Sequence, residues 1–445
     1  MARVAFTLDE PLARADGRMA GLQVRVLEMA SALARAGHDV VVAAPPPVPA
    51  DVRFPVVAPD ALGAAGPFDV WITHPRMVAA HAARLSTRAL VVDGYESPFG
   101  SFLSQATALL PRLGARVARD YRATAVQFLA AFARADRVLC ANESQRISYL
   151  TILSMLGRIG PRSPGTDAVL CVSSGAAAAP PERPRDAVAH DPVLLWCGGC
   201  YPWFDVETYL QALPAIVAAV PQVRLRFAGI DGVGGDELPL ARRIRDVVAG
   251  SPDLRARTEF TDWRPYAERG ALYAGADVGV CTYGDHLETR LSMRTRTIDM
   301  IWGGLPLVVS AGDELSRTVE SHALGRVVPP GDPIALAAAV TELLGDAPGR
   351  RRATANARAL ATGALGWDRQ VEPLAAFCAA VETGRIAPHA ALPAAETIVR
   401  LNDGPRRRAA DAVRRLAWRL GNAWRRARTE GVGPMLRPML RKVGT

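Results

Sequence analysis

The sequence predicts an α/β protein with two domains of βαβ repeats that face a cleft, followed by a basic C-terminal helical tail. Short apolar segments alternate with segments of helical spacing in two successive series, as expected for parallel strands joined by helices. Residues 176–192, which contain four Pro and six Ala, separate the two series. The net charge of the 445-residue chain, +9, equals the net charge of residues 401–445, so the rest of the chain is neutral.

The first series predicts a Rossmann-like domain. We expect strands at 3–8, 39–44, 69–73, 89–92, 136–141 and 169–172, and helices at 24–36 and within 100–135. The loop that runs from Gly17 to Gly21 lies between the first strand and the first helix, where such domains bind phosphates. Because this loop lacks the full G-x-G-x-x-G spacing, it is a weak signal on its own.

The second series predicts another Rossmann-like domain. We expect strands at 193–197, 224–228, 258–260, 276–281, 307–310 and 325–328, and helices at 206–220, 238–249, 266–274 and 333–344. A further helix between the last strands carries Ile298, Ile301 and Trp302 at helical spacing. In open parallel sheets, ligands bind beyond the carboxyl ends of the strands, so we expect the cleft there.

A polar loop joins the strand at 276–281 to the helix that carries Trp302. Its polar side chains are Glu288, Thr289, Arg290, Ser292, Arg294 and Arg296. Hydroxyls, cations and free backbone N–H groups at a helix start suit a phosphorylated or sugar-like ligand. The alternative is that the charged side chains only form surface ion pairs around the loop.

Composition excludes several classes of protein. No apolar segment reaches the ~20 residues of a membrane span, and the six scattered cysteines fit reduced thiols, so we expect a cytoplasmic protein. The only lysine, Lys442, lies in the tail, which excludes a Walker P-loop lysine and a pyridoxal Schiff base in the folded body. Cys197 and Cys200 are spaced like a redox pair, but Cys197 ends a predicted buried strand, and no second Cys or His pair completes a zinc site.

Several segments resemble glycosyltransferases of the GT-B fold, in particular the large family-4 group of retaining enzymes (bacterial glycosyltransferase group 1). The segments are Gly21 before the first helix, Gly37-His38-Asp39-Val40, Ala135-Asp136-Arg137-Val138 before Glu143-Ser144, Trp196-Cys197-Gly198-Gly199, residues 221–229, Leu272-Tyr273-Ala274-Gly275-Ala276-Asp277 and Gly304-Leu305-Pro306-Leu307-Val308-Val309. Their order and spacing agree over residues 1–384. The resemblance implies an acceptor domain at 1–180, a nucleotide-sugar donor domain at 181–365, a helix at 366–384 that crosses back to the first domain, and the tail at 385–445.

The resemblance also implies roles for residues of the second domain. In the family, a carboxylate at the start of the helix before the Gly-x-Pro turn binds the ribose hydroxyls, and Asp299 matches this position. Glu288 is the nearest candidate for an upstream Glu near the sugar, although its spacing to Asp299 is longer than usual. The expected donor-binding residues are Gly21, Gly198, Gly199, Glu288, Thr289, Ser292, Arg294, Arg296 and Asp299.

Two basic residues of the family are missing. The Arg and the Lys that clamp the diphosphate fall on Gly199 and Phe204 in this sequence. Arg290, Arg294 and Arg296 are the candidate replacements, because arginine binds phosphate oxygens bidentately.

Three residues at strand ends of the first domain are the candidate catalytic residues. His74 follows the strand at 69–73, and Asp93 and Glu96 follow the strand at 89–92. We expect them to face the cleft and to orient an acceptor hydroxyl or bind the transferred sugar. For His74 the alternative is structural, because buried histidines often only satisfy a backbone carbonyl.

The tail is a separate prediction. Val413, Leu416, Leu420 and Trp424 fall on one helical stripe, and arginines surround that stripe. Such a helix suits the surface of an anionic membrane, which would place the protein peripherally on the inner face of the cell membrane. The alternatives are a helix packed on the body or a solvated tail. We expect no nucleic-acid partner, because the body is neutral and the tail has no recognisable module.

The sequence thus predicts a retaining glycosyltransferase of the hexosyl type. It would move a sugar from a nucleotide-diphosphate donor to an acceptor hydroxyl, in the synthesis of a cell-envelope or surface polysaccharide or glycolipid. We expect no metal and no other cofactor, because helix N-termini and cations stabilise the departing diphosphate in this family. Two alternatives stay open: a catalytically inactive GT-B protein that binds glycan or lipid, and a GT-B-fold epimerase that acts on the nucleotide-sugar itself.

Overall fold

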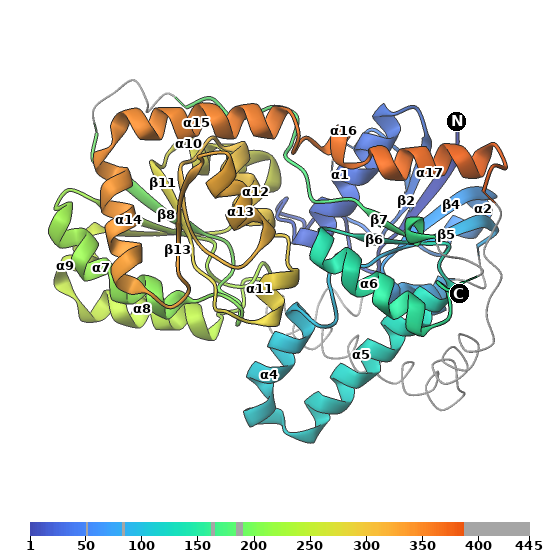
Figure 1. The fold of residues 1–445 in the computed structure, drawn as a ribbon, viewed down its shortest axis with the longest axis horizontal. Coiled ribbons are helices and arrows are strands. Elements are labelled where there is room, and N and C mark those ends of the chain that lie inside the picture. Colours follow the sequence, from blue (N-terminus) through green and yellow to red (C-terminus); the bar gives the residue numbers. More distant parts are fainter. Residues whose placement is uncertain (50–51, 82–84, 162–164, 184–189, 387–445) are drawn as a thin grey trace, which may run out of the picture.

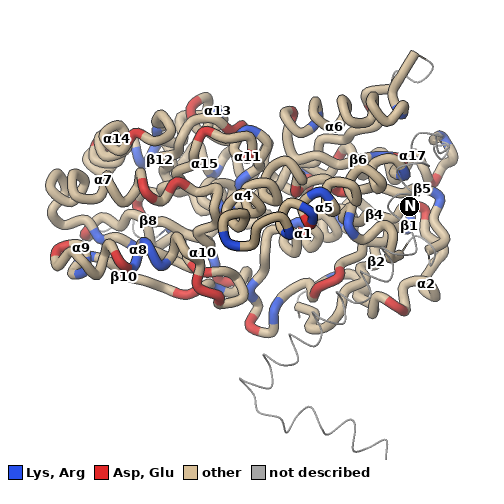
Figure 2. The backbone as a smooth tube through the Cα atoms, turned by 90° about the horizontal axis from the view of Figure 1, so that it is seen from below, with Lys and Arg blue, Asp and Glu red and all other residues tan. Residues whose placement is uncertain are grey.

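The computed structural model describes residues 1–49, 52–81, 85–161, 165–183 and 190–386. It contains two parallel β-sheets, each covered by helices, that lie next to each other along the longest axis of the molecule (Figure 1). The predicted α/β class with two parallel-sheet domains is therefore confirmed. Positive and negative residues are interspersed along the backbone of both domains (Figure 2).

The first domain is built on a seven-stranded sheet of order β3-β2-β1-β4-β5-β6-β7. The strands are β1 (Arg3–Thr7), β2 (Asp39–Ala43), β3 (Val56–Val57), β4 (Phe68–Thr73), β5 (Thr87–Asp93), β6 (Arg137–Cys140) and β7 (Val169–Cys171). The helices are α1 (Gly21–Arg35), α2 (Leu62–Ala65), η1 (Pro75–Met77), α3 (Val78–His81), α4 (Ser101–Leu113), α5 (Ala115–Arg134), α6 (Glu143–Met155) and η2 (Thr166–Ala168). β1 pairs with β2 on one side and with β4 on the other, so the strand order reverses at β1. At such a reversal, the loops that follow the two adjacent strands, here β1 and β4, run to opposite sides of the sheet.

The second domain repeats this plan with a six-stranded sheet of order β10-β9-β8-β11-β12-β13. The strands are β8 (Val193–Cys197), β9 (Arg224–Ala228), β10 (Thr258–Thr261), β11 (Val278–Cys281), β12 (Leu307–Ser310) and β13 (Gly325–Val328). The helices are α7 (Val206–Ala219), α8 (Pro239–Gly250), α9 (Pro252–Arg257), η4 (Tyr266–Glu268), α10 (Arg269–Ala274), α11 (Leu287–Leu291), α12 (Thr295–Trp302), α13 (Glu314–Ser321), α14 (Pro333–Gly345) and α15 (Ala347–Thr362). Here the order reverses at β8, which pairs with both β9 and β11.

Two stretches differ from the expected elements. The helical region 100–135 is two helices rather than one, because Gly114 adopts a left-handed backbone with φ +56° and ends α4. The resulting hairpin of α4 and α5 extends away from the rest of the first domain (Figure 1). The expected polar loop after β11 contains the short helix α11, whose start is capped by His286.

The chain crosses between the domains twice. Ala176, in the first crossing, donates its backbone N–H to the carbonyl of Leu365, in the second crossing, at 2.7 Å. After this second crossing come α16 (Trp367–Gln370) and α17 (Glu372–Glu382), which lie on the first domain (Figure 1). Apolar side chains of these helices, among them Leu374 and Phe377, belong to the core of the first domain.

The tail prediction lies outside the described residues, since these end at 386. No helix in the described part of the chain is long and apolar enough to cross a membrane.

Candidate functional site: a pocket between the two domains

A pocket with a cavity volume of about 380 Å³ lies between the domains. The first domain contributes the start of α1, the loop after β5 and the start of α4, with Gly21, Glu96 and Ser101 among the lining residues. The second domain contributes the ends of β8 and β9, the segment before α10, and α12 with the loop that precedes it. The pocket therefore lies beyond the carboxyl ends of strands in both sheets, where parallel sheets bind ligands.

A glycine turn at the end of β8 forms one wall of the pocket. Gly198 adopts φ +83°, and a Cβ atom at this position would lie 2.9 Å from a guanidinium nitrogen of Arg296. At Gly199 a Cβ atom would lie 2.8 Å from the ring of Tyr201. Both positions thus exclude larger side chains, and the turn leaves room for Arg296 to reach the wall.

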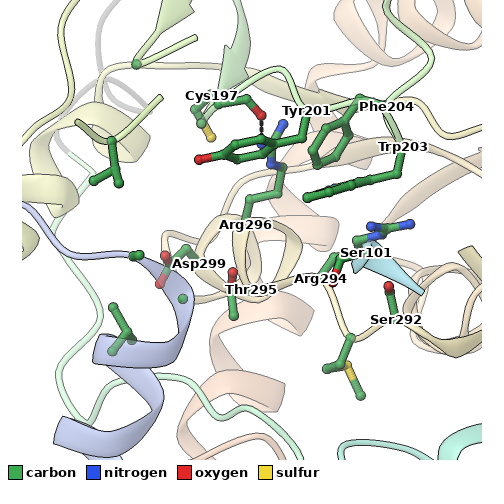
Figure 3. A pocket seen from close by; sticks show the side chains of 18 of the residues that line it. Ser101, Cys197, Tyr201, Trp203, Phe204, Ser292, Arg294, Thr295, Arg296 and Asp299 are labelled. Atoms are coloured by element: carbon green, nitrogen blue, oxygen red, sulfur yellow. Dashed lines mark hydrogen bonds between the residues drawn. The ribbon is translucent and has the colours of Figure 1, made fainter. Parts of the chain in front are cut away.

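Arg296 projects from the first turn of α12 toward this glycine turn (Figure 3). Its Nη2 donates a hydrogen bond to the carbonyl of Gly199 at 2.7 Å, and its guanidinium carbon lies 3.7 Å from the ring centroid of Phe204. Its Nη1 is buried and has no hydrogen-bond partner within the described residues. None of the ion pairs found in those residues involves Arg296, so its charge faces the pocket without a carboxylate.

Asp299 lies on the same helix and also lines the pocket. Its Oδ1 accepts a hydrogen bond from Nε of Arg269 at 3.2 Å, and the guanidinium of Arg269 stacks over Trp302 at 4.2 Å. Burial raises the pKa of the Asp299 carboxyl above its ordinary value, while the charge of Arg269 opposes that rise. A carboxylate held in this way can accept hydrogen bonds from ligand hydroxyls.

Glu288 and Arg294 neutralise each other at the opposite side of the pocket. Arg294 donates two hydrogen bonds of 2.6 Å to the two oxygens of Glu288, and Ser292 Oγ donates a third at 2.6 Å. Both charged side chains are buried, and Arg294 stacks over Tyr283 at 4.4 Å. This bidentate pair lines the pocket but supplies no net charge to it.

The two remaining polar candidates of the loop lie outside the pocket lining. Thr289 is buried, and its Oγ1 donates to the carbonyl of Gly284 at 2.8 Å. Arg290 is exposed and pairs with Asp285 at 2.9 Å. Of the three candidate arginines, Arg296 is therefore the one whose charge is directed into the pocket without a carboxylate partner in the described chain.

The three candidate catalytic residues of the first domain are in different surroundings. Glu96 lines the pocket, and burial raises the pKa of its carboxyl above the ordinary value. Asp93 is buried and receives two hydrogen bonds from the guanidinium of Arg25, at 2.7 and 3.0 Å. His74 is also buried, and its Nδ1 accepts the backbone N–H of Arg76 at 3.3 Å.

Neither Asp93 nor His74 is among the residues that line the pocket. Burial holds the pKa of His74 well below its usual value, and its ring packs edge-on against Phe128. The fold thus places Glu96 in the pocket lining together with the expected donor-binding residues, whereas Asp93 and His74 lie outside that lining. The catalytic roles of all three residues stay predictions.

The pocket contains residues that the sequence reasoning did not single out. Arg269 holds Asp299, and Tyr266 crosses to the first domain, where its hydroxyl donates to Glu28 at 2.9 Å. Trp263 stands over Gly229, where a Cβ atom would lie 3.0 Å from the indole. These residues follow β10, so the rule that ligands bind beyond strand ends was a signal that could have identified them.

The cysteines at the glycine turn do not favour thiolate chemistry. Cys197 and Cys200 are both buried free thiols, and burial raises their pKa values to about 12 and about 11. Within the described residues, no group of three or more His, Cys, Asp or Glu side chains is arranged to hold a metal ion.

Comparison with known proteins identifies the class of fold. Sucrose-phosphate synthase from Thermosynechococcus elongatus has a TM-score of 0.61 at 17% identity, over 86% of this chain and 100% of that chain. The Anabaena protein HepE, solved in complex with UDP and glucose, has a TM-score of 0.59 at 16% identity, over 85% and 100%. WaaG, a glycosyltransferase involved in lipopolysaccharide biosynthesis, has a TM-score of 0.56 at 16% identity, over 86% and 100%. Because the sequence identities are this low, the structural similarity establishes the fold of the chain and not its activity.

The chain therefore has the GT-B fold, as the sequence resemblance implied. Residues 191–346, within the second domain, match the family described as Glycosyl transferases group 1. No curated protein sequence matches the chain.

Proposed function

We propose that this protein is a retaining glycosyltransferase that moves a hexose from a nucleotide-diphosphate donor to an acceptor hydroxyl. The observation that carries the proposal is the guanidinium of Arg296, which lies in the interdomain pocket against Gly199 and has no carboxylate partner in the described chain. A partly buried cation without a counter-ion favours an anionic ligand, and a diphosphate is the anionic part of such a donor. The family match of residues 191–346, which include Arg296, supports this choice.

The geometry suggests how the donor would lie. The diphosphate would contact Arg296 and the N-terminus of α12, where free backbone N–H groups and the helix dipole favour negative charge. The ribose hydroxyls would reach Asp299, which lies one helical turn further along α12. The sugar would then lie toward the first domain, where Glu96 lines the pocket.

This arrangement suits a transfer that uses neither a metal nor a covalent enzyme intermediate. Arg296 and the start of α12 would stabilise the negative charge that develops on the departing diphosphate. The acceptor hydroxyl would attack from the same face as the leaving group, which retains the configuration at the anomeric carbon. Activity that is unchanged in EDTA is the expected result, and loss of activity that added Mg²⁺ or Mn²⁺ restores would contradict this part of the proposal.

A cell-envelope glycan or a glycolipid is the acceptor class we propose. WaaG, which shares the fold, is involved in lipopolysaccharide biosynthesis. The basic amphipathic stripe within residues 401–445 suits a peripheral position on an anionic membrane, a proposal that rests on the sequence of the tail.

A thermal-shift screen against UDP, GDP, ADP, TDP and their sugar conjugates tests the donor site. A ligand at 100 times its Kd stabilises the fold by about 2.7 kcal/mol, so a true donor should raise the Tm by several degrees. Arg296→Gln should weaken binding of the nucleoside diphosphate by about 10- to 100-fold, since hydrogen bonds to charged groups contribute about 1.5–3 kcal/mol. Arg290→Gln is the matched control and should leave binding unchanged, because Arg290 is exposed and lies outside the pocket lining.

Other outcomes of the screen would favour the alternatives. Binding without sugar transfer to any glycan or lipid acceptor would favour an inactive GT-B protein. Conversion of the bound nucleotide-sugar without an acceptor would favour an epimerase. Equal effects of Arg296→Gln and Arg290→Gln would overturn the proposed position of the diphosphate.

A further inference from the structure

The loop between β8 and α7 carries two aromatic side chains at the wall of the pocket. Tyr201 and Trp203 both line the pocket, and their rings stack with centroids 4.9 Å apart and an angle of 20° between the ring planes. Both side chains are partly buried and pack against the core of the second domain. Tyr201 thus covers one face of the indole of Trp203. The proposed position of the donor gives this aromatic pair no role so far.

The loop that carries these rings is tied to neighbouring segments of the second domain. The backbone N–H of Cys200 donates to the carbonyl of Ile230 at 2.8 Å. The backbone carbonyl of Trp203 accepts a hydrogen bond from Nε2 of His286 at 3.2 Å. The indole N–H, by contrast, forms no hydrogen bond with the described residues. The loop therefore holds the indole in position, and its N–H is available to a ligand.

Polar side chains of the first domain line the same pocket. Ser101 and Gln105 lie on the first turns of α4, and their side chains form no hydrogen bond with the described residues. Glu96, from the loop after β5, also lines the pocket. A hydroxyl, an amide and a carboxyl from one domain thus share the pocket with an indole from the other. Sites for small molecules typically combine an aromatic lining with a few such polar groups.

The start of α4 lies close to the second domain on the side of Trp203. A Cβ atom at Gly100 would lie 3.5 Å from Cγ of Glu288, which belongs to the second domain. Figure 3 shows Tyr201 against one face of the indole and Ser101 on the side of the other face. The open face of Trp203 is therefore directed toward polar groups of the first domain.

Trp203 and Asp299 lie on opposite sides of Arg296 (Figure 3). In a nucleotide-sugar, the diphosphate joins the ribose at one end to the transferred sugar at the other. If the diphosphate contacts Arg296 and the ribose contacts Asp299, the sugar lies on the side of Trp203. The indole is thus placed where the transferred sugar would be.

We propose that the indole of Trp203 binds the apolar face of the donor hexose. The C–H bonds on one side of a pyranose ring form such a face, and a flat aromatic ring covers it and excludes water. The hydroxyls at the edge of the sugar would bond with Ser101 and Gln105. This inference rests on the proposed function and makes Trp203 a specificity-determining residue.

The charges near this face favour an uncharged hexose over a hexuronic acid. Glu288 neutralises Arg294 through two hydrogen bonds of 2.6 Å, so Arg294 is not available to a sugar carboxylate. The sugar would also face the carboxyl of Glu96. A hexuronic acid would bring a further carboxylate to that side of the pocket.

Fluorine NMR of the full chain labelled with fluorotryptophan gives a local test. The chain has eight tryptophans, and the resonance that is lost in Trp203→Phe belongs to Trp203. UDP, GDP, ADP and TDP are compared with their glucose, galactose and mannose conjugates. A hexose conjugate should shift the resonance of Trp203 beyond the shift caused by its nucleoside diphosphate alone. Trp196 is the internal control and should not shift, because it is buried in the core of the second domain.

Binding affinities give a second test. Trp203→Ala should weaken binding of the hexose conjugate by about 5- to 10-fold and leave binding of the nucleoside diphosphate unchanged. Trp203→Phe keeps an aromatic face and should recover most of the lost affinity. Arg296→Gln is the contrasting variant and should weaken both ligands by the same factor, because both contain the diphosphate. The hexuronic acid conjugate should bind the unsubstituted protein more weakly than the hexose conjugate does.

The possible results separate this inference from the proposed donor site. A resonance of Trp203 that shifts as far with the nucleoside diphosphate alone would overturn the inference, because the base or the phosphates then contact the indole. A shift that requires an added glycan would assign Trp203 to the acceptor and would also overturn it. Equal losses of affinity for both ligands in Trp203→Ala would have the same consequence while the donor site stands. Failure of every nucleotide and conjugate to bind would overturn the donor site and this inference together.

Discussion

The position of the Arg296 guanidinium depends on two adjacent glycines, Gly198 and Gly199, because a larger side chain there would occupy the same space. Gly198 leaves room for the side chain, Gly199 accepts its hydrogen bond, and the ring of Phe204 stacks beneath its charge. The family pattern would place an Arg and a Lys at positions 199 and 204, so in this chain a cation from α12 occupies the space beside both positions. We infer that the charge of the diphosphate clamp is retained while its origin in the sequence has moved.

Glu96 provides a prediction about pH at the scale of a single residue. Burial is the largest cause of the raised pKa of its carboxyl, and the charges of Glu10 and Asp93 act in the same direction. A carboxyl whose pKa is raised by folding favours the fold while it is protonated, and this contribution is lost as the pH rises through the raised pKa. Glu96→Gln should therefore raise the Tm at pH 8 by about 1–3 °C and have little effect at pH 4.

Melting curves at pH 4 and pH 8 check this prediction. Glu342→Gln is the control of opposite sign, because Glu342 is exposed and its hydrogen bond to Arg326 lowers its pKa. That variant should not gain stability at pH 8. An equal change in Tm at both pH values for Glu96→Gln would show that ionisation of Glu96 has no part in the effect.

At the scale of an element, α17 joins the C-terminal end of the described chain to the first domain. Leu374, Phe377 and Val381 are all buried in the first-domain core, although they follow the whole second domain in the sequence. The guanidinium of Arg137, at the start of β6, lies 5.0 Å from the ring centroid of Phe377. The first domain is therefore incomplete until the second domain has been synthesised.

Phe377→Ala should destabilise the first domain by about 3–5 kcal/mol, which is the usual cost of truncating a buried aromatic side chain. Glu372→Ala, at the exposed start of the same helix, removes only a surface ion pair with Arg369 and should cost about 0–1 kcal/mol. Urea unfolding followed by fluorescence measures both variants. Similar midpoints for Phe377→Ala and the unsubstituted protein would mean that α17 is not part of the cooperative core.

At the scale of the whole molecule, polar contacts hold the two domains across the cleft. The hydroxyl of Tyr266 donates to Glu28 on α1 at 2.9 Å. At the other side, Gln145 Nε2 of α6 donates to the carbonyl of Leu291 at 2.8 Å. Tyr266 also accepts a hydrogen bond at its carbonyl from Arg269, the partner of Asp299. The contact that closes the cleft is thus adjacent to the carboxylate that we assign to the ribose.

Tyr266→Phe should open the cleft and weaken donor binding together. The substitution removes one hydrogen bond between the domains and leaves the carboxylate of Glu28 without it, so nucleotide affinity should fall about 2- to 13-fold, as expected for about 0.5–1.5 kcal/mol. Small-angle scattering should show a larger radius of gyration in the absence of nucleotide. Tyr121→Phe, on α5 away from this contact, is the control. An unchanged radius and affinity would show that other contacts suffice to close the cleft.

The sequence alone determined the fold class and the expectation of a pocket at the strand ends, because both follow from local patterns. Alternation of apolar strands with helical spacing predicts two parallel sheets, and the strand ends then point to the loop that contains Glu288, Arg294 and Arg296. The separation of α4 from α5 was not predicted. Gly114 lies within a long stretch of helical composition, and only its left-handed backbone shows the break.

The tertiary structure decided what each charged residue of the site can do. It pairs Glu288 with Arg294, encloses Asp93 with Arg25, and leaves Arg296 directed into the pocket. It also brings Tyr266 to Glu28, across more than half of the chain. The physical reason is that an ion pair or a hydrogen bond requires atoms about 3 Å apart, and that separation depends on how whole elements pack rather than on the spacing of residues in the sequence.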